Sequence, residues 1–195
     1  MKSNKNTAVF IDRDGTISEE VGYLNHVDRL KLIKFTSRAI KLLNKKGLKT
    51  VVVTNQAGVA RGYFSEELIH ETHEKLKKLL SKSGAYLDGI YYCPHHPEGK
   101  SKRYRKNCNC RKPNPGMIKR ASDELNIDIS SSYVVGDKIS DISLAHNVKA
   151  KGILVLTGFG KGELEYYKNN GSKPDYVADD LYDAVKWIIK DIKQM

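Results

Sequence analysis

The sequence predicts an α/β fold in which a mostly parallel, Rossmann-like sheet carries helices on both faces. Three observations lead to this expectation. Short apolar runs rich in β-branched residues alternate along the chain with longer segments of helical periodicity. Some of these runs contain no charged residue, which is typical of strands buried on both faces of a parallel sheet. No repeat or linker interrupts the 195 residues, so we expect one domain, residues 1–195.

The expected strands are bounded by glycine, aspartate or asparagine. They span residues 8–11, 50–54, 89–93, 133–136, 152–156 and 175–177. The expected helices span residues 36–46, 65–81, 115–125, 140–146, 163–169 and 181–192. Ser65 is a start signal for the second helix, and Gly47 and Gly84 follow the first and second helices as stop signals. Two long segments, 16–33 and 94–114, fit neither pattern, and long loops in compact domains often carry function.

The chain has a formal net charge of +11, with lysines spread along it rather than gathered on one element. Such a charge suits nucleic acid, an anionic membrane or a phosphorylated substrate, and a merely solvated surface would show it too. No apolar run is long enough to span a bilayer. The first apolar stretch, 8–11, stops at Asp12 and is too short for a signal-peptide core, so we expect a cytoplasmic protein without a membrane partner.

Two carboxylates follow the first expected strand directly. Asp12 and Asp14 are two positions apart, so their side chains leave an extended chain toward the same space. Adjacent carboxylates repel, and a divalent cation such as Mg²⁺ relieves the repulsion. In phosphoryl transfer Asp12 would attack phosphorus, while Asp14 would protonate the leaving group and later activate water. An Asp-Gly pair after a strand is also a common turn signal, so this pair alone leaves both interpretations open.

Polar residues also follow the second and fourth expected strands, at the edge where open α/β sheets bind ligands. Thr54 ends the second strand, where a threonine is more often only a strand residue; a role for its hydroxyl in binding the transferring phosphoryl group rests on the family resemblance given below. Asn55 and Gln56 come next, where a substrate would lie. Asp137 follows the fourth strand and would complete the Mg²⁺ ligands, and Lys138 could reach a substrate phosphate.

All three cysteines lie in one short stretch, which favours metal binding over a disulfide framework. Cys93, Cys108 and Cys110 with one imidazole would form a closed tetrahedral zinc site of the structural kind. His95 and His96 are both available, and we choose His95 because it repeats the Cys-x-Cys spacing. The alternative is one buried free cysteine and two surface ones.

Two cations follow the last cysteine directly, and zinc would position them without taking part in the chemistry. Lys112 would neutralise charge on the phosphoryl group, and Arg111 could hold a second phosphate in a bidentate way. A basic run in the same loop is either solvated or an additional attraction for an anionic substrate; it comprises Lys100, Lys102, Arg103, Arg105 and Lys106.

Four motifs occur in the order of a known family. The segments Asp-Arg-Asp-Gly-Thr at 12–16, Thr54-Asn55, Lys112 and Gly-Asp-Lys-Ile-Ser-Asp at 136–141 resemble the four motifs of haloacid-dehalogenase-like phosphatases. The zinc loop, from Cys-Pro-His-His-Pro-Glu-Gly at 93–99 to Cys-x-Cys-Arg-Lys-Pro-x-Pro-Gly-Met at 108–117, resembles the D-glycero-D-manno-heptose-1,7-bisphosphate 7-phosphatases of heptose biosynthesis. Gly22-Tyr23 looks like their substrate loop, while Glu20-Val21 departs from the more polar pair expected there.

This resemblance implies Mg²⁺ as catalytic cofactor, structural Zn²⁺, an aspartyl-phosphate intermediate, a monomer and no large cap domain. Asp12, Asp137 and the backbone carbonyl of Asp14 would hold Mg²⁺. The substrate contacts would come from Arg13, Gly22, Tyr23, Asn55, Gln56, Arg111 and Lys138. Asp141 would orient Lys138 or a metal-bound water, or would only cap its helix.

Two other functions compete with a sugar bisphosphate phosphatase. A histidinol-phosphate phosphatase would share the zinc ligands, but the long insert and Arg111 disfavour it. A basic zinc-stabilised nucleic-acid module would need aromatic residues interleaved with the cations, and the loop offers only Tyr104, so we expect no nucleic-acid partner. We interpret the glycines at 158, 160 and 162 as a flexible loop, and His70 and His73 as surface or core residues.

Overall fold

A computed structural model describes residues 5–170 and 172–194, with side chains for all of these except 166–170. Its centre is a six-stranded sheet in the order β3-β2-β1-β4-β5-β6, and every pair of neighbouring strands is parallel. The strands are β1 (Ala8–Ile11), β2 (Lys49–Asn55), β3 (Gly89–Cys93), β4 (Tyr133–Gly136), β5 (Lys151–Val155) and β6 (Tyr176–Ala178). The predicted fold class is confirmed.

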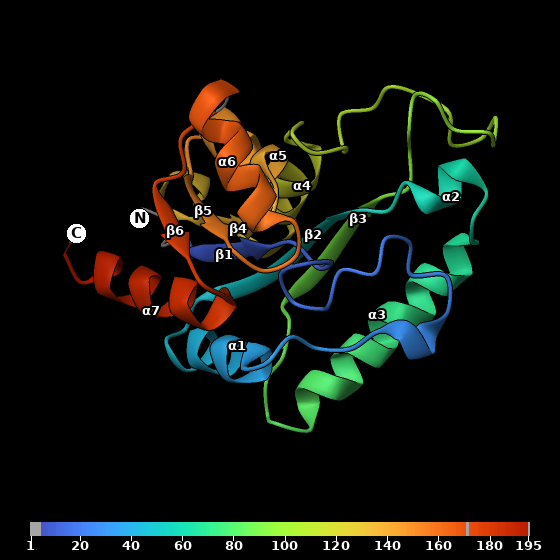
Figure 1. Cartoon of the computed structure of the whole chain (residues 1–195). Helices are drawn as coiled ribbons and strands as arrows, with labels where there is room; N and C mark the ends of the chain where they lie inside the picture. Colours follow the sequence, from blue (N-terminus) through green and yellow to red (C-terminus); the bar gives the residue numbers. More distant parts are fainter. Residues whose placement is uncertain (1–4, 171, 195) are drawn as a thin grey trace.

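Helices cover both faces of the sheet, so the molecule has three layers (Figure 1). One face carries α1 (Thr36–Lys45), α3 (Glu66–Ser81) and α7 (Leu181–Ile192), and the other carries α4 (Gly116–Leu125), α5 (Ile139–Asn147) and α6 (Gly160–Asn170). Every helix expected from the sequence is present, although α6 begins at Gly160 rather than at 163. A short helix, α2 (Gly58–Arg61), and two 3₁₀ turns, Val27–Arg29 and Ile129–Ser131, were not expected.

The first strand shows why the sheet is buried on both faces. Val9 and Ile11 belong to the core under α1 and α7, while Ala8 and Phe10 belong to the core under α4 and α5. All four are fully buried, as the alternation of side chains along a strand requires when both faces are covered. The residue that follows β1 therefore has a fixed position and direction.

The strand order places a topological switch point between β1 and β4. The chain winds from β1 outward to β2 and β3, then returns to β4 on the other side of β1. In open α/β sheets, ligands bind at the carboxyl ends of the two strands that flank such a point. Asp12 follows β1 and Asp137 follows β4, and the backbone N–H of Asp12 donates to Val135 O at 2.9 Å. The two acidic motifs therefore lie together at the carboxyl ends of β1 and β4, where α/β sheets bind ligands.

The two long segments lie near this edge. The segment after β1 includes the turn Val27–Arg29, which packs against α3, and the segment after β3 contains no helix or strand up to Gly116. Within the described parts of the chain, none of the helices combines the length and apolarity that crossing a bilayer demands.

Candidate active site

Three buried carboxylates meet at the switch point. Asp12, Asp137 and Asp141 each offer an oxygen within 4.8 Å of the others, and the three side chains are 6%, 0% and 0% exposed. Burial, followed by repulsion from Asp12, raises the pKa of Asp137 to about 8. Burial is also the main reason that the pKa of Asp141 rises to about 6. Gathering these charges away from water is unfavourable unless a cation joins them.

This cluster fits a divalent cation with oxygen ligands. Asp137 Oδ1 is buried and has no hydrogen-bond partner among the described residues. Orphaned buried acceptors of this kind are rare in proteins, and a metal ion would satisfy it. The three carboxylates and the Lys112 ammonium carry −3 and +1, so the ionised cluster has a net charge of −2. That charge balances one Mg²⁺. The side chain of Asp14 lies outside this cluster, so any ligand from Asp14 would be its backbone carbonyl.

Two glycines allow the backbone to close around Asp137. A Cβ added to Gly15 would lie 2.1 Å from Asp137 Oδ2, and one added to Gly158 would lie 2.2 Å from the same atom. Both have positive φ, +82° and +55°, which favours glycine. Phe159 N–H donates to Asp137 Oδ2 at 2.9 Å, and Thr157 Oγ1 donates to Gly15 O at 2.6 Å. The expectation of a merely flexible glycine loop at 158–162 is therefore wrong, because its first residues hold Asp137.

Lys112 lies between two members of the cluster. Its Nζ is 2.9 Å from Asp12 Oδ1 and 2.6 Å from Asp141 Oδ1, and the side chain is 2% exposed. Burial lowers its pKa, but the two carboxylates outweigh burial and hold that pKa above its usual value. Asn55 fixes the backbone here: its Oδ1 accepts from Lys112 N at 3.0 Å and its Nδ2 donates to Lys112 O at 3.3 Å. Lys112 is thus a rigidly placed cation beside Asp12.

The contacts of Asp141 include the expected helix cap but not the expected pairing with the Lys138 side chain. Its carboxylate pairs with Lys112 and accepts from the backbone N–H of Lys138 at 3.3 Å, which caps α5. It does not bind the Lys138 ammonium, which instead lies 4.4 Å above the Phe159 ring. The reason is geometric, because the side chain of Lys138 is 40% exposed while Asp141 points inward beside Gly136. Asp141 orients Lys112 rather than the side chain of Lys138.

Asp14 lies on the wall of the active-site cavity, and the buried Arg13 binds its carboxylate from the protein interior. Arg13 Nε donates to Asp14 Oδ1 at 3.0 Å and Arg13 Nη2 donates to Oδ2 at 2.7 Å. Burial would raise the pKa of Asp14, but the charge and hydrogen bonds of Arg13 outweigh it and the net pKa is lowered. Arg13 itself is 1% exposed and does not line the cavity in front of Asp14. The predicted substrate contact of Arg13 is therefore wrong, since its guanidinium is committed to Asp14.

The end of β2 completes the inner wall. Gln56 Nε2 donates to Thr54 Oγ1 and to Asp14 Oδ2, each at 2.9 Å. Thr54 is 1% exposed and Gln56 4%, so both are held in place. The predicted residues of this motif do lie together, and Gln56 has a function that the sequence did not reveal, since it joins Thr54 to Asp14.

A cavity of about 380 Å³ opens in front of these groups. Asp12, Asp14, Thr54 and Lys112 lie on its wall together with every predicted substrate residue except Arg13, namely Gly22, Tyr23, Asn55, Gln56, Arg111 and Lys138. Glu20 and Ser140, from segments noted in the sequence, also line it, and the sequence did not single out five further lining residues: Leu24, Ala57, Gly58, Phe64 and Phe159.

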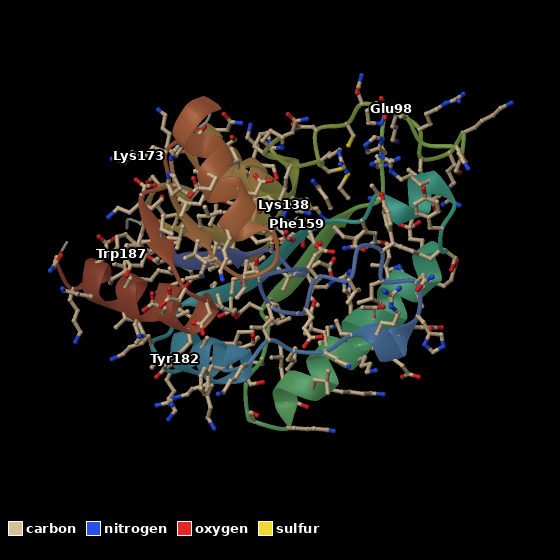
Figure 2. All side chains as sticks on the ribbon, in the orientation of Figure 1. Glu98, Lys138, Phe159, Lys173, Tyr182 and Trp187 are labelled. Atoms are coloured by element: carbon tan, nitrogen blue, oxygen red, sulfur yellow. The ribbon has the colours of Figure 1, made fainter. Side chains whose placement is uncertain are left out.

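The mouth of the cavity is partly aromatic. Figure 2 shows Lys138 and Phe159 side by side above the sheet. Lys138 Nζ is also 3.9 Å from Glu20 Oε2, so the acidic residue that departs from the family pattern faces the cavity. Across from them, the exposed rings of Tyr23 and Tyr63 meet edge to face at 4.6 Å. A larger groove of about 820 Å³ runs along β3 and α3, but none of the predicted catalytic residues lines it.

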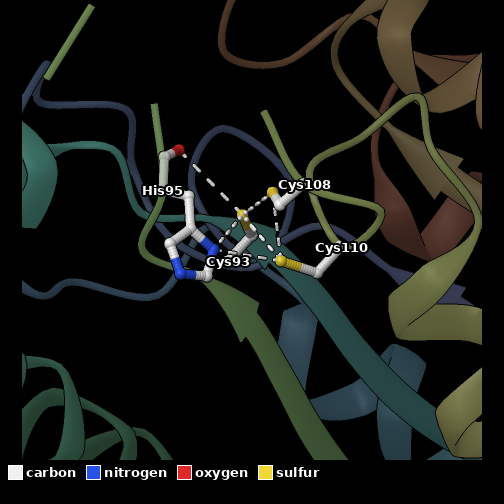
Figure 3. Close-up of side chains that lie close together, drawn as sticks. All are labelled: Cys93, His95, Cys108 and Cys110. Atoms are coloured by element: carbon white, nitrogen blue, oxygen red, sulfur yellow. Dashed lines mark hydrogen bonds between the residues drawn. The ribbon is translucent and has the colours of Figure 1, made fainter. Parts of the chain in front are cut away.

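The cysteine loop forms a compact four-ligand cluster (Figure 3). The three sulfur atoms of Cys93, Cys108 and Cys110 are 3.2 to 3.5 Å apart, and His95 Nδ1 is 3.3 Å from Cys110 Sγ. Disulfide sulfurs would be about 2.0 Å apart, and sulfurs around tetrahedral zinc about 3.8 Å. His96 is turned away, with Nε2 3.3 Å from Arg61. The donor set and its spacing fit zinc, with His95 as the imidazole ligand.

This cluster anchors the loop that carries Lys112. Cys93 ends β3 and is fully buried, so one side of the cluster is part of the sheet. Cys110 immediately precedes Arg111, whose Nη1 donates to His95 O at 3.4 Å. Arg111 is half-buried and lines both the main cavity and a neighbouring one of about 300 Å³. Four of the five cations of the basic run, Lys100, Lys102, Arg103 and Arg105, are exposed and line neither of these two cavities.

Comparison with known proteins identifies the family. A family model described as HAD-hydrolase-like matches residues 109–184. The D-glycero-D-manno-heptose-1,7-bisphosphate 7-phosphatase of Thermosynechococcus vestitus is 44% identical over 185 residues, which cover 93% of this chain and 94% of that protein. The D-glycero-beta-D-manno-heptose-1,7-bisphosphate 7-phosphatase of Haemophilus influenzae is 42% identical over 193 residues, covering 97% of this chain and all of that protein.

A solved structure shows the same architecture. The D,D-heptose 1,7-bisphosphate phosphatase of B. bronchiseptica, solved as a complex with magnesium and phosphate, superposes with a TM-score of 0.85 at 27% identity, covering 95% of this chain and 99% of that one. The chain therefore belongs to the haloacid-dehalogenase-like phosphatases, within the family that includes these heptose-bisphosphate 7-phosphatases.

Proposed function

We propose that this protein is a Mg²⁺-dependent phosphatase that removes the 7-phosphate of D-glycero-D-manno-heptose 1,7-bisphosphate through an aspartyl-phosphate on Asp12. The observation that carries this proposal is the buried group of Asp12, Asp137 and Asp141, in which Lys112 pairs with Asp12 and Asp141, and from which Asp12 and Lys112 line a cavity of about 380 Å³. Relatives over 40% identical across nearly the whole chain are named for this substrate. The histidinol-phosphate alternative gains no support from those names.

In the first step Asp12 attacks phosphorus from the end of β1. Its carboxylate is aimed by the backbone N–H of Arg13, which donates to Asp12 Oδ1 at 2.7 Å. Lys112, 2.9 Å from the same oxygen, offsets charge on the transferring group, and Thr54 lies on the same wall. Mg²⁺, held by Asp12, Asp137 and the Asp14 carbonyl, would supply further charge neutralisation. The negative charge of the bound phosphate favours the protonated form of Asp14, which gives its proton to the leaving sugar oxygen as the bond from that oxygen to phosphorus breaks.

In the second step Asp14 accepts a proton from the water that hydrolyses the aspartyl-phosphate. An ionised Asp14 suits this role, and its lowered pKa keeps it ionised in the resting protein. Arg111 and Lys138 also lie on the cavity wall, and we expect them to bind the phosphate that is retained on the sugar. A bisphosphate therefore matches the cavity better than a monoester with one anionic group.

We also propose that Zn²⁺ binds Cys93, His95, Cys108 and Cys110 and has a structural role, and that the chain acts as a monomeric single domain, residues 1–195. Thiolate ligands require a reducing compartment, which supports the cytoplasm as its location. The substrate is a phosphorylated sugar, and neither nucleic acid nor membrane is a partner.

The test is Mg²⁺-dependent phosphate release from both anomers of the heptose bisphosphate and from histidinol phosphate. The Asp12→Asn variant is the control, because it keeps the shape of the site and removes the nucleophile. Fast release from one heptose anomer that is lost in Asp12→Asn supports the proposal. Release from histidinol phosphate alone would keep the mechanism and overturn the substrate.

A further inference from the structure

Arg13 contacts Asp14 from the protein interior, on the side of Asp14 that faces away from the cavity. Arg13 is 1% exposed and forms a two-point ion pair with Asp14 through Nε and Nη2. Paired contacts of this kind fix direction as well as distance. A buried arginine therefore determines which way the Asp14 carboxylate faces, and the position of Asp14 depends on whatever orients Arg13.

A histidine from α3 occupies the remaining edge of the guanidinium. His73 Nε2 lies 3.4 Å from Arg13 Nη1, and His73 is 5% exposed. A guanidinium can only donate hydrogen bonds, so Nε2 must be the unprotonated nitrogen and the proton must sit on Nδ1. Burial, followed by the charge of Arg13, lowers the pKa of His73 to about 3, which agrees with a neutral ring. The charged groups around it are Arg13, Asp14, His70 and Lys77.

His73 is itself braced by a chain of contacts. Its ring packs edge to face on Tyr92 with centroids 5.7 Å apart. Tyr92 donates its hydroxyl to Glu66 Oε1 at 2.7 Å, and Tyr104 of the zinc loop donates to Glu66 Oε2 at 2.6 Å. The histidine is therefore held between α3, the edge strand and the zinc loop, and has little freedom to turn away from Arg13.

We propose that Arg13 and His73 are positioning residues for the reaction, with neutral His73 accepting from Arg13 so that Arg13 holds Asp14 at the angle needed for proton transfer. This inference rests on the proposed phosphatase activity, in which Asp14 is the acid and base. Neither residue lines the 380 Å³ cavity in front of Asp14, although His73 lines the larger groove along α3, so both act on the reaction through Asp14. His73, on another element and 60 positions away along the chain, becomes part of the proton-transfer apparatus.

A misplaced acid harms some substrates more than others. A sugar alkoxide is a poor leaving group and needs a proton from Asp14, whereas a 4-nitrophenolate leaves without one. Positioned general acid and base groups typically contribute about 10² to 10⁴-fold to rate. A variant with misplaced Asp14 should therefore lose more of its rate on the sugar phosphate than on 4-nitrophenyl phosphate. A variant with general structural damage should lose rate on both alike.

The kinetic experiment compares four variants on heptose bisphosphate and 4-nitrophenyl phosphate at saturating Mg²⁺. Arg13→Met should lower kcat on the sugar phosphate by at least about 10²-fold, with a clearly smaller loss on the aryl ester. His73→Met should lower the same kcat about two- to tenfold, as expected for one lost hydrogen bond, with KM little changed. His73→Gln keeps an acceptor and should restore most of the rate. Glu71→Gln, on an exposed face of the same helix, should match the wild type.

Equal losses on both substrates, or a His73→Gln variant as slow as His73→Met with an unchanged melting temperature, would overturn the proposal. A second measurement needs no substrate: long-range ¹H–¹⁵N NMR of the wild-type imidazoles between pH 5 and 8. His73 should remain neutral with its proton on Nδ1 throughout. A proton on Nε2, or titration near pH 6.5, would refute the contact with Arg13. If the wild type releases no phosphate from the heptose, the proposed function fails while the NMR result still decides the contact.

Discussion

Replacing Gly158 with alanine would push a methyl group into the predicted Mg²⁺ site. The new Cβ would lie 2.2 Å from Asp137 Oδ2 and 2.6 Å from the backbone Cα of Gly15. Ordinary contacts are about 3.5 Å or more, so Asp137 or the loop must move by roughly 1 Å. The φ of +55° adds strain for any residue with a Cβ. We therefore expect the variant to lose both stability and affinity for Mg²⁺.

The magnitude follows from two contributions to the free energy of unfolding. A left-handed backbone costs about 1–2 kcal/mol for alanine, and overpacking costs about 1–3 kcal/mol. In a chain of 195 residues the sum corresponds to a melting temperature lower by roughly 5–15 °C. Mg²⁺ tolerates little departure from octahedral ligands at about 2.0–2.1 Å. A shift of Asp137 by about 1 Å should therefore raise the Mg²⁺ concentration for half-maximal activity by at least about tenfold.

Gly162→Ala is the matched control. It changes a glycine four residues away in the same run, where an added Cβ meets nothing within 4 Å. Because Gly162 lies in α6, alanine should stabilise the protein by about 0.5–1 kcal/mol and leave Mg²⁺ dependence unchanged. Differential scanning fluorimetry and Mg²⁺ titration of turnover measure both quantities. A Gly158→Ala variant with the melting temperature and Mg²⁺ dependence of Gly162→Ala would refute the close packing around Asp137.

Three further predictions concern other parts of the site. Cys108→Ser should remove zinc, measured by elemental analysis, and lower kcat and melting temperature together, because the loop that carries Lys112 loses its anchor; full activity without zinc would contradict this. Arg111→Met should lower kcat/KM for the bisphosphate by about tenfold or more and spare that for a sugar monophosphate; equal effects on both would exclude a contact with the second phosphate. His73 has a pKa of about 3 in the folded protein against 6.5 in the unfolded chain, so its contribution to stability is present above pH 6.5 and is lost as the pH falls toward 3. Urea unfolding at pH 5 should therefore show about 2 kcal/mol less stability than at pH 7 from this residue, and His73→Gln should reduce the difference; an unchanged pH dependence would argue that His73 is not buried as a neutral ring.

The sequence predicted those features that depend on residues close together in the chain, such as strands, strand ends and the cysteine cluster. The uncharged run at Val51–Val53 predicts a buried strand, and the acidic pair after β1 marks the end of that strand. Both signals could be recognised because strand burial and strand ends depend on neighbouring residues. Parallel strands then bring their carboxyl ends to one edge, so Asp12 and Asp137 could be placed together before any coordinates. The four residues of the cysteine-histidine cluster could be grouped for the same reason, since they are close in sequence.

The features that the sequence missed depend on contacts across the fold. Asp141 binds Lys112 instead of the Lys138 ammonium, and nothing near either residue indicates that pairing. The same is true of His73 beside Arg13, since α1, β2, α2 and the first half of α3 lie between them along the chain. The helix α2 is only four residues long, Gly58–Arg61, too short to show a period. The glycine run that begins at Gly158 was interpreted from its spacing and its place in the chain, whereas Gly158 packs against Asp137, which follows a different strand.

The cysteine-histidine cluster should make the position of Lys112 independent of how many residues lie between His95 and Cys108. His95 and Cys108 clamp the two ends of residues 96–107, and Lys112 follows beyond the clamp. We expect that residues between these two ends can be added or removed while the Lys112 ammonium stays 2.9 Å from Asp12, provided that Tyr104, which donates to Glu66, is kept. A shortened-insert variant that retains Tyr104 and keeps its rate on 4-nitrophenyl phosphate would demonstrate that independence.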